Sequence, residues 1–366
     1  MFVYRTSNFI MNPVLSIDGL KESPIMDMTL FGQKFTMYSD EWKRHVHLKC
    51  TDRCDARCGF CIEESERNNP QDMFGFMDST EELLDQMTAN DYLRTVSITG
   101  GEPTLFPMID KLITKIQSYD LKLFSINSNG AALKNIPNHF NGWINISKHA
   151  IDDRHIFNRK LNVTPEYIDE FRARVPAAKV RIQCVLGAKE GLQSIGDILK
   201  LMETFTGHVD DFSFRSLIID DDHSKIPLLF TEFRKFLFEF GTCKEQAIQD
   251  YYVYETFDLN GTSITISYSN MNLLRVYNET TPDNNFLQEI IVHPDGMITG
   301  SWNKQTLVIK ETLNMDSHIL VENGEMFDGD RGMFIDSFFS NADDANIIEW
   351  CRDNGWSLEI DGVKHL

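Results

Sequence analysis

The stretch Lys49-Cys-Thr-Asp-Arg-Cys-Asp-Ala-Arg-Cys-Gly-Phe-Cys61 places Cys54, Cys58 and Cys61 in the spacing C-x3-C-x2-C. Cysteines this close together are typical of metal sites. Three thiolates can hold three irons of a 4Fe-4S cube and leave the fourth iron open for another ligand. Structural zinc is the alternative, but it usually takes four ligands in two separated pairs, and the second pair is missing here. A zinc-stabilised binding module therefore stays open as the weaker alternative.

Cysteine is sparse in the rest of the chain. The 366 residues contain seven cysteines, an odd number, whereas disulfide scaffolds are short and dense in cysteine. The count argues against a disulfide framework. We therefore expect a protein of a reducing compartment, and the cytoplasm is the natural location.

Further motifs follow the cysteines at intervals along the chain. The segment Ser97-Ile-Thr-Gly-Gly-Glu-Pro-Thr104 has paired glycines, which allow close backbone approach, and a carboxylate that can accept a hydrogen bond from an ammonium group. Phe124-Ser-Ile-Asn-Ser-Asn-Gly130 ends in a polar turn, and Ile144-Asn-Ile-Ser-Lys-His-Ala-Ile-Asp-Asp153 is a further strand with polar residues near its end. Each of these alone more often closes an ordinary turn.

Together, these motifs resemble the radical S-adenosylmethionine (radical SAM) superfamily. Thr51 to Cys61 is similar to the cluster-binding signature of that family, and the Gly-Gly-Glu-Pro segment is similar to its methionine-binding motif. Cys50 lies outside the frame, because a cluster that began there would need a thiolate at the position of Arg57. The resemblance covers residues 44–240.

The resemblance implies one 4Fe-4S cluster and S-adenosylmethionine (SAM) as cofactors, with an electron donor such as flavodoxin or ferredoxin. It assigns Cys54, Cys58 and Cys61 to the cluster. It assigns the following residues to SAM: Phe60, Gly100, Gly101, Glu102, Asn127, Ser128, Asn129 and Ser147. Substrate residues are harder to select, and His149, Gln183 and Arg215 are candidates at predicted strand ends.

Strand-like and helix-like segments alternate from residue 44 to residue 240. Strands are expected at 44–49, 94–99, 121–127, 143–149, 179–187 and 211–219, with helices at 79–89, 107–118, 164–174, 193–206 and 228–240. This alternation predicts an α/β fold with a parallel sheet. Six units are too few for a closed eight-stranded barrel, so we expect a partial (β/α)6 barrel with its site at the carboxyl ends of the strands.

The segments on either side complete a three-part division: an N-terminal extension (1–43) with a small hairpin, the barrel (44–245) and a C-terminal α+β cap (246–366). The cap contains two hairpin signals, at Asn260-Gly261 and Asp295-Gly296, then a helix at 342–353 and a strand at 356–360. It resembles a degenerate auxiliary-cluster domain. Where relatives have a cysteine after the second hairpin turn, this chain has Gly300-Ser-Trp302, so we expect no auxiliary cluster.

Composition limits the possible partners. The 35 basic and 55 acidic residues give a formal net charge of −20, which disfavours duplex nucleic acid. No apolar run approaches the length of a membrane span. We expect an enzyme that abstracts hydrogen from a small polar metabolite, sugar or nucleotide; a peptide-modifying enzyme is the alternative.

Overall fold

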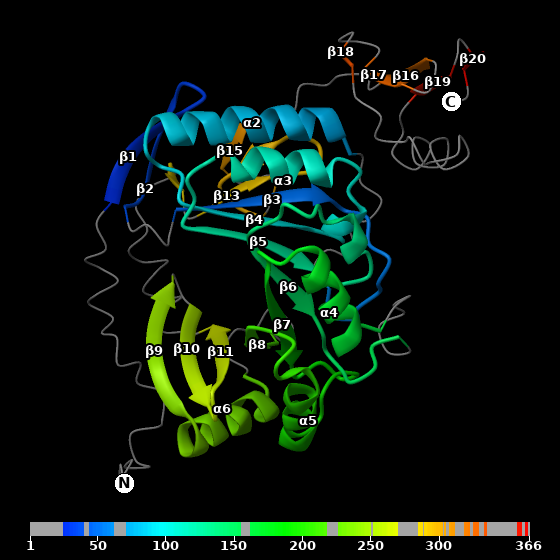
Figure 1. The fold of residues 1–366 in the computed structure, drawn as a ribbon. Coiled ribbons are helices and arrows are strands. Elements are labelled where there is room, and N and C mark those ends of the chain that lie inside the picture. Colours follow the sequence, from blue (N-terminus) through cyan, green and yellow to red (C-terminus); the bar gives the residue numbers. More distant parts are fainter. Residues whose placement is uncertain are drawn as a thin grey trace.

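A computed structural model describes most of the chain between residues 25 and 311 and a small sheet beyond it (Figure 1). The described residues are 25–39, 44–61, 71–154, 162–217, 226–249, 252–269, 285–287, 289–302, 304, 307–311, 318–322, 325–328, 333–334, 357–360 and 363–364. Among these residues, no helix combines the length and apolar character needed to cross a membrane.

A curved sheet of twelve strands forms the centre of the molecule. Its middle consists of six parallel strands in chain order: β3 (His45–Thr51), β4 (Thr95–Gly100), β5 (Leu123–Ser128), β6 (Trp143–Ser147), β7 (Lys179–Leu186) and β8 (Asp211–Ser216). In the described sheet, β3 and β8 do not pair with each other, so the barrel is open. The predicted α/β fold with a partial barrel is therefore confirmed.

Helices connect the parallel strands and lie on the convex side of the sheet (Figure 1). They are α2 (Met73–Ala89), α3 (Ile109–Gln117), α4 (Pro165–Arg174), α5 (Ile195–Phe205) and α6 (Leu228–Phe240). Helix α2 begins six residues earlier than the sequence suggests, because the Asp72 side chain accepts hydrogen bonds from the amides of Phe74 and Gly75. Thr164 and Ser194 cap α4 and α5 in the same way.

The two faces of the sheet differ sharply in polarity. Alternate residues that face the helices are apolar and buried: Val46, Leu48, Val96, Ile98, Ile126, Ile144, Ile146, Val180, Ile182, Phe212 and Phe214. The intervening residues face the concave side and are mostly polar: His45, His47, Lys49, Ser97, Ser125, Asn127, Asn145, Ser147, Arg181, Gln183, Asp211, Ser213 and Arg215. The helix-covered face thus supplies the hydrophobic core, and the concave face supplies groups for binding.

C-terminal strands extend this sheet at both edges. Beside β8 lies β11 (Thr262–Ser269), followed by β10 (Tyr252–Leu259) and β9 (Thr242–Gln249). Beside β3 lies β13 (Ile290–Val292), followed by β14 (Ile298–Thr299) and β15 (Val308–Lys310). Both predicted hairpins are confirmed, whereas β9 and the parallel pairing of β11 and β13 with barrel strands were not predicted.

Smaller sheets lie outside this central one. The predicted N-terminal hairpin is confirmed as β1 (Ile25–Leu30) and β2 (Gln33–Tyr38), which pairs with β12 (Phe286–Leu287). A separate sheet contains β16 (His318–Glu322), β17 (Glu325–Asp328), β18 (Met333–Phe334), β19 (Ser357–Ile360) and β20 (Val363–Lys364). The expected final strand corresponds to β19, and the expected helix at 342–353 lies outside the described residues. The three-part domain division stays a prediction.

Candidate functional site

The cysteine loop begins where β3 ends, at the carboxyl edge of the parallel sheet. Cys54, Cys58 and Cys61 are half-buried. The amide of Cys61 donates to the carbonyl of Cys58 at 3.0 Å, which closes a turn around the last two thiols. In the described part of the chain, no three His, Cys, Asp or Glu side chains are placed to hold a single metal ion. Cube ligands bind separate irons, so a cluster does not require such convergence.

A buried ion pair anchors the start of this loop. The Lys49 ammonium lies 2.8 Å from a carboxylate oxygen of Asp52, and both side chains are almost fully buried. Lys49 comes from the concave face of β3, and Asp52 is the first residue after that strand. The pair therefore ties the loop to the barrel interior two residues before the first cysteine.

The paired glycines of β4 pack directly against the cysteine loop. The amide of Gly101 donates to the Thr51 carbonyl at 2.6 Å, and the amide of Glu102 donates to the Arg53 carbonyl at 2.7 Å. A Cβ atom on Gly101 would lie 2.2 Å from the Arg53 oxygen, and Gly100 has a φ of +137°. Neither position accepts a side chain without distortion. The glycines thus allow the end of β4 to approach the backbone that carries the cysteines.

Glu102 joins the ends of β4 and β5. Its fully buried carboxylate accepts bonds from the Thr104 amide (3.0 Å) and hydroxyl (2.6 Å), the Ser128 hydroxyl (2.7 Å) and the Asn129 amide (2.5 Å). Burial raises the pKa of Glu102, and the hydrogen bonds from Thr104, Asn129 and Ser128 oppose that rise. Its role as an acceptor for an ammonium group stays a prediction, because in the structure both oxygens already accept bonds from the protein.

Asn129 connects the end of β5 to the cysteine loop. Its side-chain amide donates to a carboxylate oxygen of Asp55 at 2.6 Å and lies 3.8 Å from the Cys54 sulfur. Asp55 was not among the predicted site residues, although it lies inside the cysteine motif. Glu102, Ser128, Asn129 and Cys54 are therefore brought together by hydrogen bonds.

The other predicted SAM residues lie on the neighbouring strands. Asn127 accepts a hydrogen bond from Asn145 at 2.9 Å, and Ser147 stands two residues further along β6. The Asn145 Oδ1 atom is buried and has no hydrogen-bond partner among the described residues. An orphan acceptor of this kind is costly unless a ligand satisfies it. Asn145 was not among the predicted SAM residues. The alternation of side chains along β6 could have indicated it, because Asn145 lies on the same concave face as Ser147.

Phe60, the remaining SAM candidate, contacts a substrate candidate. Its ring packs edge-on against His149, with centroids 4.8 Å apart. His149 is buried, and its Nδ1 atom accepts from the Val185 amide at 3.1 Å. The structure therefore gives His149 a definite contact with the backbone of β7.

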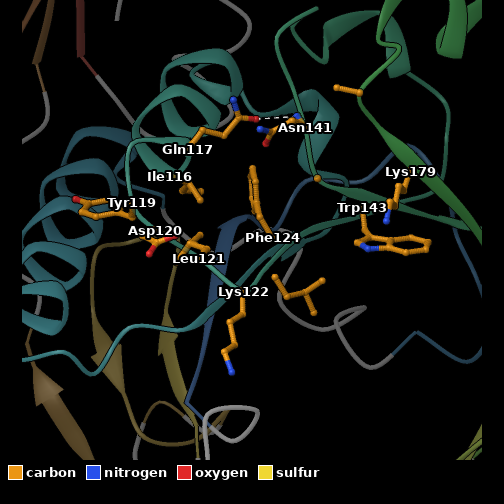
Figure 2. Close-up of a pocket in the computed structure, with 13 residues that line it drawn as sticks. Ile116, Gln117, Tyr119, Asp120, Leu121, Lys122, Phe124, Asn141, Trp143 and Lys179 are labelled. Carbon is orange, nitrogen blue, oxygen red and sulfur yellow. Dashed lines mark hydrogen bonds between the residues drawn. The ribbon is translucent and has the colours of Figure 1, made fainter. Parts of the chain in front are cut away.

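A cleft of about 340 Å³ opens at the other end of the parallel strands, at their amino ends (Figure 2). Lys122, Asn141, Trp143 and Lys179 are among its lining residues, and the ammonium of Lys179 lies 5.4 Å from the Trp143 ring centroid. None of the predicted cluster or SAM residues lines this cleft. The candidate site is therefore at the opposite end of the barrel.

Comparison with protein families identifies this arrangement. Residues 48–202 match the model described as "Radical SAM superfamily". These residues form a radical SAM domain. The match begins in β3 and ends in α5, so the radical SAM domain includes the cysteine loop and the ends of β4, β5 and β6. Members of this family use a 4Fe-4S cluster and S-adenosylmethionine, in agreement with the predicted cofactors.

Curated relatives of the radical SAM domain are cyclases by name. The chain is 32% identical over 111 residues to the probable GTP 3',8-cyclase of Sulfolobus acidocaldarius, covering 29% of this chain and 34% of the relative. It is 24% identical over 198 residues to the GTP 3',8-cyclase of Aquifex aeolicus, covering 48% and 62%. The matched region thus spans less than two thirds of the length of each of these relatives.

Solved structures with a similar arrangement include native anSMEcpe with bound AdoMet and TYW1 with a lysine-pyruvate adduct bound. The first has a TM-score of 0.43 at 13% identity and covers 74% of this chain and 78% of that one. The second has a TM-score of 0.35 at 18% identity and covers 56% and 77%. At these scores, the neighbours add nothing to the family assignment.

Proposed function

We propose that this chain is a radical SAM enzyme that acts on a small polar metabolite, sugar or nucleotide. When bound, the reduced cluster and SAM supply a 5'-deoxyadenosyl radical that abstracts hydrogen from the substrate. The observation that supports the proposal most directly is the docking of the cysteine loop onto the Gly-Gly-Glu turn, within the segment that matches the family.

The residues present fit these cofactors. Cys54, Cys58 and Cys61 are half-buried side chains in one loop, and they would hold the cluster. The turn at Gly100, Gly101 and Glu102, with the polar ends of β5 and β6, would hold SAM; this assignment adds Asn145 to Asn127, Ser128, Asn129 and Ser147. The orphan Asn145 Oδ1 atom gives a hydroxyl or amino group of the cofactor an acceptor in the protein interior.

The protein's own contribution is to bind, orient and exclude water. The Lys49–Asp52 pair and the Asn129–Asp55 bond fix the loop on either side of Cys54. Glu102 fixes the neighbouring strand ends. A preformed cradle reduces the ordering that binding and reaction would otherwise require.

The polar concave face supports a polar substrate. Its side chains on β7 and β8 include Gln183, Ser213 and Arg215, and no ion-pair partner is found for Arg215 among the described residues. The relatives named GTP 3',8-cyclase act, by that name, on a nucleotide, which lies within the proposed substrate class. We propose a flavodoxin or ferredoxin as electron donor and a cytoplasmic location, because thiolate cluster ligands need reducing conditions.

Anaerobic reconstitution tests the cofactor assignment. We expect a brown protein with about four irons per chain that forms 5'-deoxyadenosine from SAM with dithionite. Cys58→Ala should lose both properties. Cys50→Ala is the matched control, because Cys50 lies outside the C-x3-C-x2-C spacing with its sulfur in the core, 3.5 Å from the Thr99 carbonyl. Stoichiometric zinc in a colourless wild-type protein would instead support the binding module.

Substrate-dependent turnover tests the substrate class. We expect a nucleotide or sugar to raise 5'-deoxyadenosine formation above the substrate-free rate, and GTP is the first compound to try. Stimulation by peptides alone would support the peptide-modifying alternative.

A further inference from the structure

A chain of hydrogen-bonded side chains crosses the concave face near the amino ends of β3 and β4. His45 Nδ1 lies 2.6 Å from the Thr95 hydroxyl, and His45 Nε2 lies 2.9 Å from the Ser97 hydroxyl. His47 Nδ1 lies 2.9 Å from the same Ser97 oxygen, and His47 Nε2 lies 3.1 Å from a carboxylate oxygen of Glu289. The motifs of the radical SAM domain assign no function to these five residues, here called the imidazole chain.

Strand register brings the members of the imidazole chain together. His45 pairs with Thr95 and His47 pairs with Ser97 across β3 and β4, so each imidazole has a hydroxyl beside it. Glu289 immediately precedes β13, whose Ile290 pairs with Val46 of β3. The cap segment therefore delivers a carboxyl group to the histidines of the barrel.

The hydrogen bonds of the imidazole chain can all run in either of two directions. A neutral imidazole has one donor and one acceptor nitrogen, and a hydroxyl has one proton. When Glu289 is ionised, it accepts from His47 Nε2, and every bond back to Thr95 points toward Glu289. When Glu289 is protonated, its hydroxyl donates a hydrogen bond to His47 Nε2, every bond reverses, and the Thr95 hydroxyl donates to the Arg44 carbonyl at 3.1 Å.

Electrostatics keep both imidazoles uncharged. Burial lowers the pKa of His45 well below its usual value and, with the nearby Arg215, lowers the pKa of His47 to about 3. Burial raises the pKa of Glu289, and a hydrogen bond from Trp302 opposes that rise. The charged groups that act on the imidazole chain are thus Arg215 from β8 and Glu289 itself, so Glu289 is the member that titrates.

The Glu289 end of the imidazole chain is partly exposed to solvent. The side chain of Glu289 is 30% exposed and that of His47 is 22% exposed, whereas Ser97 and Thr95 are buried. Trp302 is 38% exposed, and its ring centroid lies 4.9 Å from that of His47. A substrate on the concave face could therefore meet an aromatic surface and a carboxyl group together.

We propose that Glu289 accepts or returns a proton of a substrate hydroxyl or amino group, with His47, Ser97, His45 and Thr95 as positioning residues that set its proton affinity. In the forward direction, a substrate O–H or N–H bond breaks, the proton moves to the Glu289 carboxylate, and the electron pair stays on the substrate. No electron acceptor is required. The use of this site rests on the proposed function, but the coupling along the imidazole chain does not.

Chemical labelling tests this coupling. The full chain is treated with a carbodiimide, which modifies protonated carboxyl groups, at a series of pH values. Peptide mass spectrometry then measures the labelling of Glu289. We expect Glu289 to react up to a higher pH in the folded protein than in the urea-unfolded chain. In Ser97→Ala, His47 Nδ1 loses its partner, and an unpaired acceptor costs less than an unpaired N–H. The tautomer that donates to ionised Glu289 is then favoured, so its labelling midpoint should fall by about one pH unit.

Two further variants keep the test decisive. Ser97→Thr retains the hydroxyl and should restore the wild-type midpoint, and Ser125→Ala removes a hydroxyl from the same face outside the imidazole chain and should leave the midpoint unchanged. Identical labelling profiles for Glu289 in the folded and unfolded chain, or an unchanged midpoint in Ser97→Ala, would overturn the proposal. A reconstituted wild-type protein that forms no 5'-deoxyadenosine would instead overturn the proposed function. The two failures are therefore distinguishable.

Discussion

The two ends of the barrel interior are held together by contacts of different range. At the carboxyl end, the cysteine loop, the Gly-Gly-Glu turn and Asn129 contact one another across the ends of consecutive parallel strands. At the amino end, the imidazole chain joins β3 and β4 to Glu289, a contact between residues 242 positions apart. Binding motifs on successive strands can therefore be recognised in sequence, whereas a site completed by a distant segment depends on sheet pairing.

The largest effect is expected at the buried ion pair of the carboxyl end. Lys49→Met should lower the free energy of unfolding by about 3–5 kcal/mol, because Asp52 would keep a buried charge without its cation. Urea unfolding of the variant measures this change. Lys115→Met removes a partly exposed partner of Glu81 and should cost less than about 1 kcal/mol. Equal losses of unfolding free energy in both variants would show that the buried Lys49–Asp52 pair stabilises the protein no more than a surface pair.

A second change tests the close packing of the glycine turn. Gly101→Ala should cost about 1–3 kcal/mol and reduce the iron bound after reconstitution, because the new methyl group meets the Arg53 carbonyl. Gly59→Ala is the matched control inside the cysteine loop, where a Cβ atom would meet nothing within 4 Å. Iron content and unfolding midpoints, measured side by side, should separate the two variants; full iron in Gly101→Ala would contradict this role of the turn.

The amino end should respond mainly to pH. The pKa of His47 is about 3 in the folded protein and 6.5 in the unfolded chain, so the unfolded chain binds more protons between these values. Stability from this group is therefore present above pH 6.5 and is lost as pH falls toward 3. His47→Gln should reduce the slope of unfolding free energy against pH by up to about 1.4 kcal/mol per unit in that window. An unchanged slope in His47→Gln would contradict a buried, uncharged imidazole at this position.

The smallest effect is expected at the edge of the imidazole chain. Trp302→Phe removes a hydrogen bond that opposes the raised pKa of Glu289, so this pKa should rise further, by less than about one unit. The carbodiimide labelling midpoint of Glu289 measures the shift. Trp143→Phe serves as the control, because it changes a ring that packs against Arg181 and lines the cleft of Figure 2. A fall in the Trp302→Phe midpoint would contradict the assigned bond.

Much of the barrel could be predicted from sequence because its segments are long and periodic. The strand at 179–187 and the helix at 228–240 have strong patterns, and the structure places them at Lys179–Leu186 and Leu228–Phe240. The start of α2 was hidden by Gly75, a weak helix former that is required there because a Cβ atom would collide with the capping Asp72. Local pattern therefore failed where a cap determined the boundary.

The candidate site was predictable only where its residues form a local motif. Paired glycines and a carboxylate indicated a close approach to a ligand, but the structure shows that they also approach the Thr51–Arg53 backbone. Glu289 gave no signal of its own, because β13 has only three residues and its partner strand is fixed by the tertiary fold. The pairing of distant segments, rather than residue type, decides such contacts.

The placement of β11 and β13 on opposite sides of the barrel strands has a practical consequence. A fragment that ends at residue 245 would lack both strands and would leave the backbone amides and carbonyls of β3 and β8 unpaired along two open edges. Unprotected edges of this kind recruit strands from other molecules and promote aggregation. The barrel strands of this protein should therefore be produced only together with the C-terminal strands, and insoluble fragments should not be taken as evidence against the barrel.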